Sequence, residues 1–253
     1  MKVSIITVSY NSEATIEDTI HSVLKQTYSN IEYIIIDGDS SDGTLDIVRK
    51  HNDRIATVVS EKDKGIYDAM NKGIEQATGD VIGILNSDDF YASPTIIEQV
   101  VDAFHKTGCD ALYGDLVYVN QSQVEKVARY WKAGAYKPGA FKRGWMPPHP
   151  TFFVRADKYR ELGGYNLELK SAADYELMLR FIHKHEIEVA YLPEVMIKMR
   201  VGGQSNQSLM NRLKANREDK KAWDINGLKP APYTFIAKPV SKISQFWKRR
   251  NID

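Results

Sequence analysis

The chain has 253 residues, of which 43% are apolar and 26% are charged. This length and composition suit one large α/β domain with an appendage, or two small domains. The 34 basic and 33 acidic residues leave a formal net charge of +1. That balance argues against a nucleic-acid-binding protein that relies on bulk positive charge.

Two further features concern the cellular compartment. The single cysteine, Cys109, allows no internal disulfide bond and favours a reducing environment. The apolar run at residues 3–8 is too short for a signal-peptide core, and no other run approaches the length of a membrane span. We therefore expect a cytoplasmic protein.

Short runs rich in Val and Ile alternate with amphipathic patterns in the first half of the chain. The runs predict parallel strands at residues 3–8, 31–37, 55–61 and 80–86. The patterns between and after them predict helices at residues 16–24, 44–50, 66–77 and 93–104, the last opened by a Ser93 cap and Pro94. Such alternation predicts an α/β fold with a Rossmann-like, mostly parallel sheet flanked by helices.

Polar, mainly acidic residues follow each predicted strand. They occupy residues 9–11, 37–43, 61–63 and 86–89. Because parallel strands end at one edge of a sheet, these residues predict a cleft where nucleotides bind. The alternative is that they are turn and capping residues, and we expect capping for Ser41 and Asp42, just before the helix at 44–50.

The adjacent carboxylates Asp88 and Asp89 need a further explanation. One cap requires only one side chain, and like charges at the edge of a core repel each other and lose solvation. The sequence has neither a phosphate-loop lysine, since Thr44 stands at that position, nor a G-x-G-x-x-G motif after the first strand. A divalent metal that carries a nucleotide diphosphate accounts for the acidic pair, and hard oxygen ligands suit Mg²⁺ or Mn²⁺.

The motifs as an ordered set resemble those of a known family. Residues 3–44 (VSIITVSYN…IIIDGDSSDGT) and 60–89 (SEKDKGIYDAMNKG…GILNSDD) are similar to family 2 glycosyltransferases with the GT-A fold. PPHPTFFV (147–154) and AADYELMLR (172–180) resemble the branch that builds bacterial cell-surface polysaccharides such as O-antigen, capsule and colanic acid. The resemblance implies transfer of a sugar from a nucleotide diphosphate, usually UDP, with inversion at the anomeric carbon.

The resemblance also implies a division of the chain. Residues 1–205 are expected to form the glycosyltransferase domain, with a nucleotide-sugar-binding half at 1–120 and an acceptor-binding half at 121–205. The donor-binding positions carried over are Val8, Tyr10, Asp37, Asp39, Asp63, Lys64, Asn86 and Ser87. Gly38 stands where members often have a second Asp, so Asp39 is a candidate substitute.

The D-x-D motif of the family appears here as Asn86-Ser87-Asp88. Asn86 replaces the first carboxylate and is a poor metal ligand. We therefore expect Asp88 to be the main ligand of Mn²⁺ or Mg²⁺, with Asp89 either supporting the metal site from behind Asp88 or contacting the sugar.

On the acceptor side the resemblance assigns the catalytic base to Asp174, with Ala173 in place of the Glu that usually precedes it. The alternative for Asp174 is a favourable position in the first turn of a helix. His149, between two prolines, is a candidate for the acceptor or diphosphate side, and a structural hydrogen bond is the alternative. The glycine pair within residues 200–208 suggests either a loop that closes over the donor or an ordinary connection.

Residues 206–253 are expected to form a helical, basic amphipathic extension. Its end, residues 232–253, combines Lys and Arg with Tyr, Phe and Trp, a composition that suits an anionic membrane surface. This fits an acceptor linked to undecaprenyl diphosphate and a peripheral position at the inner face of the cytoplasmic membrane. The alternative is a segment that docks on the protein or in a dimer.

Two other functional classes remain at this point. A nucleotidyltransferase can share the sheet and the metal chemistry, but it would present a glycine-rich basic loop after the first strand, where this chain is acidic. A catalytically inert sugar-nucleotide-binding module is the other, and the presence of both Asp88 and Asp174 argues against it.

Overall fold

The computed structural model describes residues 1–121, 123–202, 209–235 and 237. The strands are β1 (Val3–Ser9), β2 (Ile31–Asp37), β3 (Thr57–Ser60), β4 (Val81–Asn86), β5 (Asp89–Tyr91), β6 (Ala111–Val119), β7 (Val127–Trp131), β8 (Phe153–Arg155) and β9 (Val189–Arg200). The α-helices are α1 (Ile16–Leu24), α2 (Thr44–Arg49), α3 (Ile66–Gln76), α4 (Ile96–Thr107), α5 (Ala156–Leu162), α6 (Ala173–Met178) and α7 (Leu209–Ile225). Short 3₁₀ turns lie at Phe141–Arg143 and His149–Thr151, and a π-helical turn, Leu179–Lys184, continues α6.

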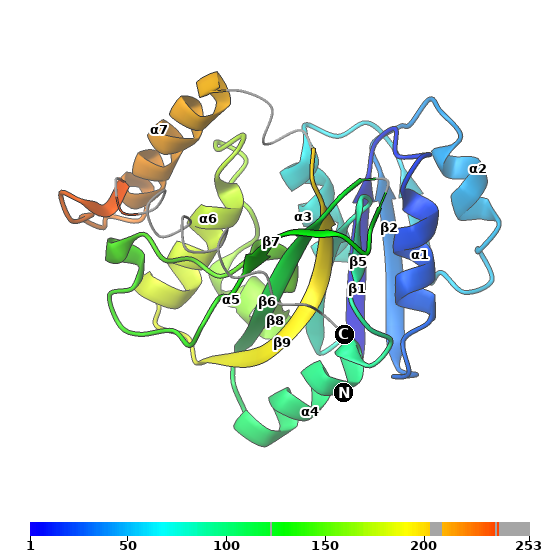
Figure 1. Cartoon of the computed structure of the whole chain (residues 1–253), viewed down its shortest axis with the longest axis horizontal. Coiled ribbons are helices and arrows are strands. Elements are labelled where there is room, and N and C mark those ends of the chain that lie inside the picture. Colours follow the sequence, from blue (N-terminus) through cyan, green and yellow to red (C-terminus); the bar gives the residue numbers. More distant parts are fainter. Residues whose placement is uncertain (122, 203–208, 236, 238–253) are drawn as a thin grey trace.

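The described strands form one sheet in the order β3-β2-β1-β4-β8-β6-β9-β5, with β7 paired to β6. The first four strands are parallel, as predicted, because β1 pairs in parallel with both β2 and β4, and β2 with β3. Beyond β4 the sheet is mixed. β8 runs antiparallel to β4 and β6, whereas the long strands β6 and β9 are parallel and curve across the molecule (Figure 1).

Helices cover both faces of the parallel part of the sheet, which explains its continuous apolar strands. Side chains alternate along β1: Ile6 and Val8 join one buried cluster, and Val3 and Ile5 join the other. The first cluster includes residues of α3, α5 and α6, and the second includes residues of α1, α2 and α4. In Figure 1, α1 and α2 lie to the right of the sheet and α6 and α7 to the left.

Two predictions about helix starts need correction. α4 begins at Ile96, and Ser93 is not its cap: the Ser93 hydroxyl accepts the Thr95 N–H in the turn before the helix. The N-cap of α2 is Gly43, which makes no side-chain capping bond, but Asp42 just before it accepts the Thr44 N–H of the first turn at 3.0 Å. Ser41 instead donates its N–H to the Asn11 side chain, since the loops after β1 and β2 lie side by side.

At the opposite end of the strands, a carboxylate ties three segments together. Glu32 Oε1 accepts the Lys2 ammonium and the Thr78 hydroxyl, both at 2.6 Å, and Oε2 accepts the Ser4 hydroxyl and the Thr78 N–H. Burial alone would raise the pKa of Glu32, but these hydrogen bonds outweigh it and lower the pKa to about 2.

Glu32→Gln should therefore lower the free energy of unfolding at pH 7, by about 1–2 kcal/mol after allowance for solvent screening. The folded pKa of about 2 lies below the reference value of 4.5, so this stabilisation is present above pH 4.5 and is lost as the pH falls toward 2. Urea unfolding of wild type and variant at pH 7 and pH 3 checks this. A difference that does not shrink at pH 3 would contradict the assignment.

Candidate active site

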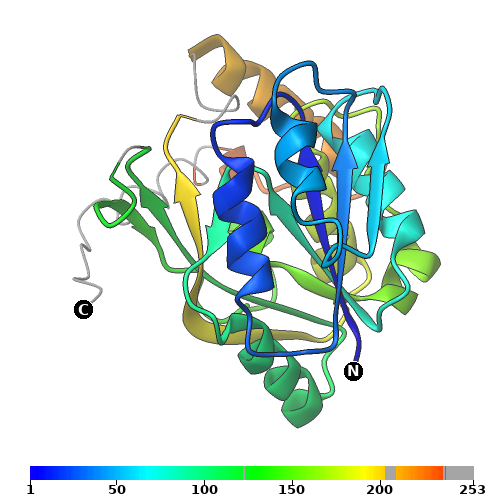
Figure 2. The same ribbon diagram turned by 90° about the vertical axis from the view of Figure 1, so that its right-hand side faces the viewer.

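The ends of the four parallel strands lie at one edge of the sheet. Ser9 is in register with Asp37, Asp37 with Ser60, and Val8 with Asn86. Figure 2 shows the arrowheads of the blue and cyan strands at this common edge. The polar residues that follow the strands are therefore brought together, as the sequence predicts.

Tyr10 and Asp63 flank the backbone of Gly38 at this edge. A Cβ atom at position 38 would lie 2.4 Å from Asp63 Oδ2 and 3.4 Å from the ring of Tyr10. The Tyr10 side chain is 59% exposed, whereas Val8 beneath it is buried. Asp63 thus occupies the space that a second Asp after Asp37 would need, which explains the glycine at position 38.

Asp37 is fully buried, and its carboxylate connects the ends of β1, β2 and β3 by hydrogen bonds. Its Oδ1 accepts the hydroxyls of Ser9 and Ser40 at 3.0 and 2.6 Å, and its Oδ2 accepts the Ser60 hydroxyl at 2.8 Å and the Ser40 N–H at 2.9 Å. Asp39 follows in the left-handed region, with φ of 65°, and is exposed. Of the two carboxylates, Asp39 is the one open to a ligand.

The loop before α3 carries Asp63 and Lys64. Asp63 Oδ1 accepts the Gly65 N–H at 2.8 Å, and the Lys64 N–H donates to Asp68 at 2.9 Å. Lys64 is exposed and Asp63 is partly exposed. The hydrogen bonds fix the backbone and leave the Lys64 ammonium on the surface.

The acidic loop after β4 presents its two carboxylates differently. Asp88 is partly exposed, but Asp89 is fully buried and accepts the Asn86 amide at 3.1 Å. Thr19 of α1 holds the loop from below, because its hydroxyl bonds the carbonyls of Ser87 and Asp89 at 3.0 and 2.7 Å. These hydrogen bonds fix the backbone of residues 86–89 against α1 and leave the Asp88 carboxylate facing solvent.

The oxygen atoms of this loop fit a hard divalent cation. Within the described part of the chain, Asn86 Oδ1 and Asp89 Oδ1 are buried without a hydrogen-bond partner. Burial raises the pKa of Asp88, and burial together with repulsion from Asp88 raises that of Asp89. Two orphaned oxygens beside a partly exposed carboxylate match the donor types that Mg²⁺ and Mn²⁺ prefer.

Arg200 at the end of β9 lies against the acidic loop and is not among the site residues predicted from the sequence. Its guanidinium donates to the Asp88 carbonyl at 2.9 Å and to the carboxylate of Asp18 in α1, and it lies 4.8 Å from the ring of Phe90. The charge of Arg200 opposes the rise in the pKa of both Asp88 and Asp89. The protein itself thus supplies a cation beside the acidic pair, and the only sequence signal was an Arg just before a glycine pair.

Asp174 is linked to the strand-end edge of the sheet by a hydrogen bond to α3. It is the second residue of α6, and its Oδ1 accepts the hydroxyl of Tyr67 at 3.1 Å. Tyr67 lies in the first turn of α3, which begins just after β3 at the edge of the strand ends. The N-cap of α6 is Ala172, with no side-chain capping bond, so Asp174 is not a side-chain cap.

A second tyrosine connects this pair to His149. Tyr165 stacks on Tyr67, with ring centroids 5.5 Å apart, and its hydroxyl lies 2.6 Å from His149 Nε2. Burial lowers the pKa of His149, and the charge of Asp174 opposes that change. His149 thus makes a structural hydrogen bond, to Tyr165, which was the alternative to a role at the acceptor or diphosphate. Neither tyrosine was singled out from the sequence, because Tyr67 falls outside the apolar stripe of α3.

The helical extension packs on α6. Trp223 of α7 is fully buried and donates its indole N–H to the Tyr175 hydroxyl at 2.8 Å, and Asn226 donates to Glu176 at 2.9 Å. Further along, Thr234 donates its hydroxyl to the carbonyl of Lys142. The predicted tail beyond residue 237, and residues 203–208 of the predicted loop, lie outside the described residues.

Comparisons with known proteins agree with this geometry. The model of the family described as "Glycosyl transferase family 2" matches residues 4–161. An uncharacterized glycosyltransferase of Mycobacterium tuberculosis is 33% identical over 181 residues, which cover 70% of this chain and 68% of that protein.

Two solved structures show the same fold. S. aureus TarS 1–349 in complex with UDP-GlcNAc superposes with a TM-score of 0.69 at 18% identity, covering 89% of this chain and 65% of that chain. The Pyrobaculum calidifontis mannosyltransferase PcManGT, in complex with GDP-Man and Mn²⁺, gives a TM-score of 0.67 at 17% identity, covering 97% and 71%. Because the family model spans more than half of the sequence, this chain belongs to glycosyl transferase family 2 and is a glycosyltransferase with the GT-A fold.

Proposed function

We propose that the protein is an inverting, metal-dependent transferase that moves a sugar from a UDP-sugar to a hydroxyl of a lipid-linked saccharide. The observation that carries the proposal is the Tyr67–Asp174 hydrogen bond of 3.1 Å, which brings a partly exposed carboxylate to the edge that also holds the Asp88 loop. A proton acceptor and a site for the leaving group are what a single displacement needs.

The donor nucleotide is assigned to the cleft beside Gly38. The exposed ring of Tyr10 offers a face on which a base can stack, and Asp63 and Asp39 offer acceptors for its N–H groups or for ribose hydroxyls. Lys64 is exposed on the next loop and is assigned to the diphosphate or the sugar. Both solved neighbours hold a nucleotide sugar, which supports this class of donor.

The metal is assigned to the loop after β4, with Asp88 as the main ligand and Mn²⁺ or Mg²⁺ as the ion. Asn86 and Asp89 carry the orphaned oxygens and support the site from below. When bound, the ion supplies charge stabilisation for the leaving diphosphate. Arg200 holds the loop through the Asp88 carbonyl and adds a fixed positive charge next to it.

Asp174 is assigned to proton transfer. Tyr67 occupies Oδ1, so Oδ2 is the oxygen that takes the proton from the acceptor hydroxyl. Burial and the charge of Asp174 raise the pKa of Tyr67, which keeps the phenol protonated and donating. A base that activates the acceptor on the face opposite the leaving group gives inversion at the anomeric carbon.

Tyr67→Phe should reduce transfer by roughly tenfold, the effect of one lost hydrogen bond to a charged group, and should leave UDP binding unchanged. Tyr28→Phe is the matched control, because Tyr28 donates its hydroxyl to the Met1 carbonyl at the opposite end of the strands. Initial rates at saturating donor measure the difference. Equal rates for the two variants would show that Tyr67 does not position the base.

The acceptor is assigned to saccharides on undecaprenyl diphosphate, in the synthesis of bacterial surface polysaccharides. Within the described residues, we find no helix with both the length and the apolar character that a membrane crossing requires. Separately, the Lys, Arg and aromatic residues of the tail at 232–253 support its assignment to peripheral contact with the inner face of the cytoplasmic membrane.

Removal of residues 238–253 should weaken binding to anionic vesicles and leave donor hydrolysis intact. The cut lies after Thr234 and Phe235, because Thr234 bonds the Lys142 carbonyl and Phe235 packs on the core. Vesicle co-sedimentation at low and high salt measures the effect, since attraction between Lys or Arg and anionic lipid is screened by salt. Unfolding of the truncated chain, or loss of a dimer, would favour a docked tail.

The experiment that tests the proposed function is a panel of nucleotide sugars incubated with the full chain in Mn²⁺, in Mg²⁺ and in chelator. We expect metal-dependent release of a nucleoside diphosphate from one UDP-sugar. Release from no member of the panel would favour an inert sugar-nucleotide-binding module. Release from a GDP-sugar alone would overturn the assignment of UDP.

A further inference from the structure

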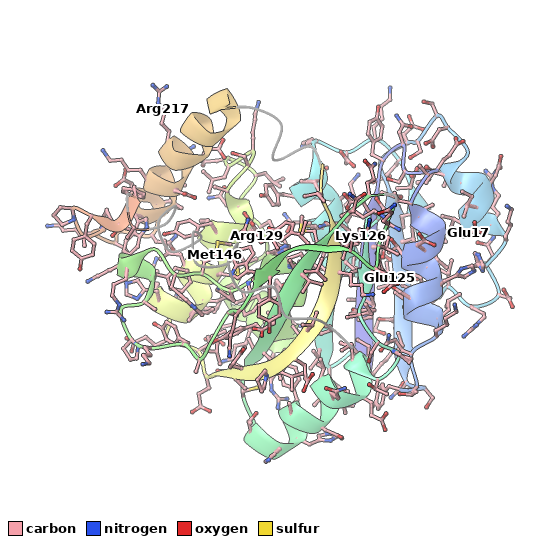
Figure 3. All side chains as sticks on the ribbon, viewed as in Figure 1. Glu17, Glu125, Lys126, Arg129, Met146 and Arg217 are labelled. Carbon is pink, nitrogen blue, oxygen red and sulfur yellow. The ribbon has the colours of Figure 1, made fainter. Side chains whose placement is uncertain are left out.

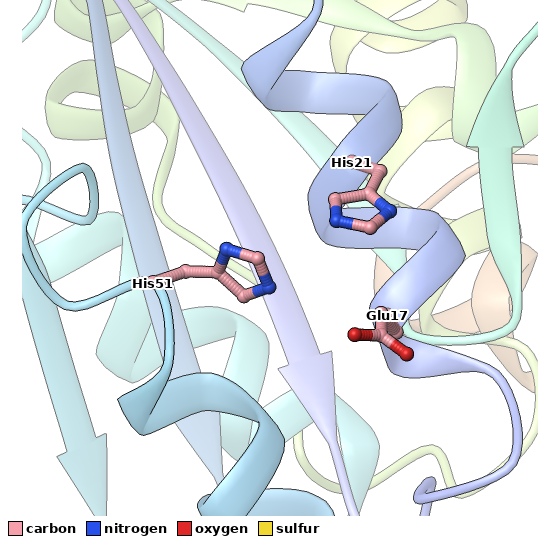
Figure 4. A group of neighbouring side chains, drawn as sticks. All are labelled: Glu17, His21 and His51. Atoms are coloured by element: carbon pink, nitrogen blue, oxygen red, sulfur yellow. The ribbon is translucent and has the colours of Figure 1, made fainter.

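Three side chains with metal-ligating atoms meet at the surface between α1 and the turn after α2. Glu17 and His21 lie four residues apart on α1, and His51 comes from the turn. Figure 4 shows the ring of His51 pointing toward the two side chains of α1. Figure 3 places Glu17 on the side of the molecule opposite Arg217 of α7. We propose that Glu17, His21 and His51 form a binding site for a transition-metal ion of the zinc class.

The geometry is close to that of a bound ion. One ligand atom from each residue lies within 4.8 Å of the others, and the two imidazole rings have centroids 5.2 Å apart in an edge-to-face arrangement. Zinc takes nitrogen and oxygen ligands at about 2.0–2.2 Å, so tetrahedral ligands are about 3.4 Å apart. Small side-chain rotations close that gap, because residues at i and i+4 share one helix face.

The polar atoms of this cluster lack other partners. His51 Nε2 is buried without a hydrogen-bond partner in the described part of the chain. No described residue forms a side-chain hydrogen bond or an ion pair with Glu17, which is exposed, or with His21, which is partly exposed. A buried ring nitrogen without a partner is costly in a folded protein, and coordination to a metal removes that cost.

The donor atoms set the chemical class of the ion. Two imidazoles and one carboxylate suit Zn²⁺, Co²⁺ or Ni²⁺, whereas Mg²⁺ and Mn²⁺ prefer oxygen ligands such as those of the Asp88 loop. Three protein ligands at the surface leave a fourth position for water. The chain therefore has two metal sites of different selectivity, and the second one does not depend on the proposed function.

A metal ion at this site would stabilise α1, the helix that holds the loop after β4 through Thr19. α1 turns Thr19 toward the carbonyls of Ser87 and Asp89 and turns Glu17 and His21 toward the turn that carries His51. An ion that joins helix and turn would restrict α1, because it binds the folded arrangement and not the separated segments. The expected consequence is a higher melting temperature.

The test is a titration of the full chain, without any polyhistidine tag, with Zn²⁺ and with Co²⁺ as a coloured substitute. Asp88→Asn serves as the background, since it weakens the oxygen-rich site. In this background we expect one ion per chain, Co²⁺ absorption typical of nitrogen and oxygen ligands, and a rise in melting temperature of about 5–10 °C at 100 times the Kd.

Adding His51→Gln to the background should weaken the affinity for Zn²⁺ at least tenfold, and Glu17→Gln should weaken it in the same direction. His105→Gln, an exposed histidine on α4, is the matched control and should change nothing. Glu17 is exposed, so Glu17→Gln is expected to fold normally, and because His51 is only partly exposed, the melting temperature of His51→Gln without metal is measured to confirm its folding. No stoichiometric ion in the Asp88→Asn background, or equal affinity with His51→Gln and His105→Gln, would overturn the proposal.

Discussion

Replacement of Asp174 by Asn should lower sugar transfer by roughly two to four orders of magnitude, the range of general base catalysis. Asn keeps the size of Asp and can still accept the Tyr67 hydrogen bond, but it cannot take a proton near neutral pH. Folding and the binding of UDP with metal should therefore stay near normal. Single-turnover transfer, with the Kd for UDP measured in parallel, separates the two effects.

Asp224→Asn is a suitable control for this variant, because Asp224 is an exposed carboxylate on α7. Near-wild-type transfer by Asp174→Asn, with donor and acceptor both verified, would show that the base lies elsewhere. His149 is then the next residue to test, since Asp89 is fully buried.

Replacement of Asp88 by Ala should reduce Mn²⁺-stimulated turnover by a hundredfold or more. Loss of a group that stabilises developing charge typically has an effect of this size. UDP binding should also weaken in the presence of metal, and it should change little in chelator. Rates measured against Mn²⁺ concentration check both points.

Asp46→Ala, an exposed acidic residue of α2, controls for the loss of one surface charge. The prediction for Asp88 fails if the variant remains active in excess chelator, or if its Mn²⁺ dependence matches that of Asp46→Ala. Either result would move the metal away from the loop after β4.

The parallel half of the fold was predictable from the sequence, because its strands are continuous apolar runs and its helices have clear apolar faces. β1 to β4 and α1 to α3 appear where the periodicity places them, within a few residues. The mixed part of the sheet, beyond β4, could not be predicted in this way. β5 and β8 have three residues each and depend on strands far along the chain, so no local pattern identifies them.

The polar edge of the sheet was also predictable, because parallel strands end together. The contacts that organise the site were not. Tyr67 meets Asp174 across 107 residues, and Arg200 meets Asp18 across 182 residues. The contact between Asp63 and Gly38 was equally unpredictable, because it forms only when the loops after β2 and β3 pack together. Membership of glycosyl transferase family 2 argues against the nucleotidyltransferase alternative. The catalytic competence of this member is what the activity experiments measure.

A single displacement with Asp174 as base inverts the anomeric carbon, so the anomeric configuration of the first product is the decisive measurement. The full chain is given an α-linked UDP-sugar that it hydrolyses in metal, and the released sugar is followed by proton NMR before mutarotation. We expect the β-anomer to appear first and Asp174→Asn to suppress its release. Initial release of the α-anomer would contradict inversion and, with it, the role assigned to Asp174.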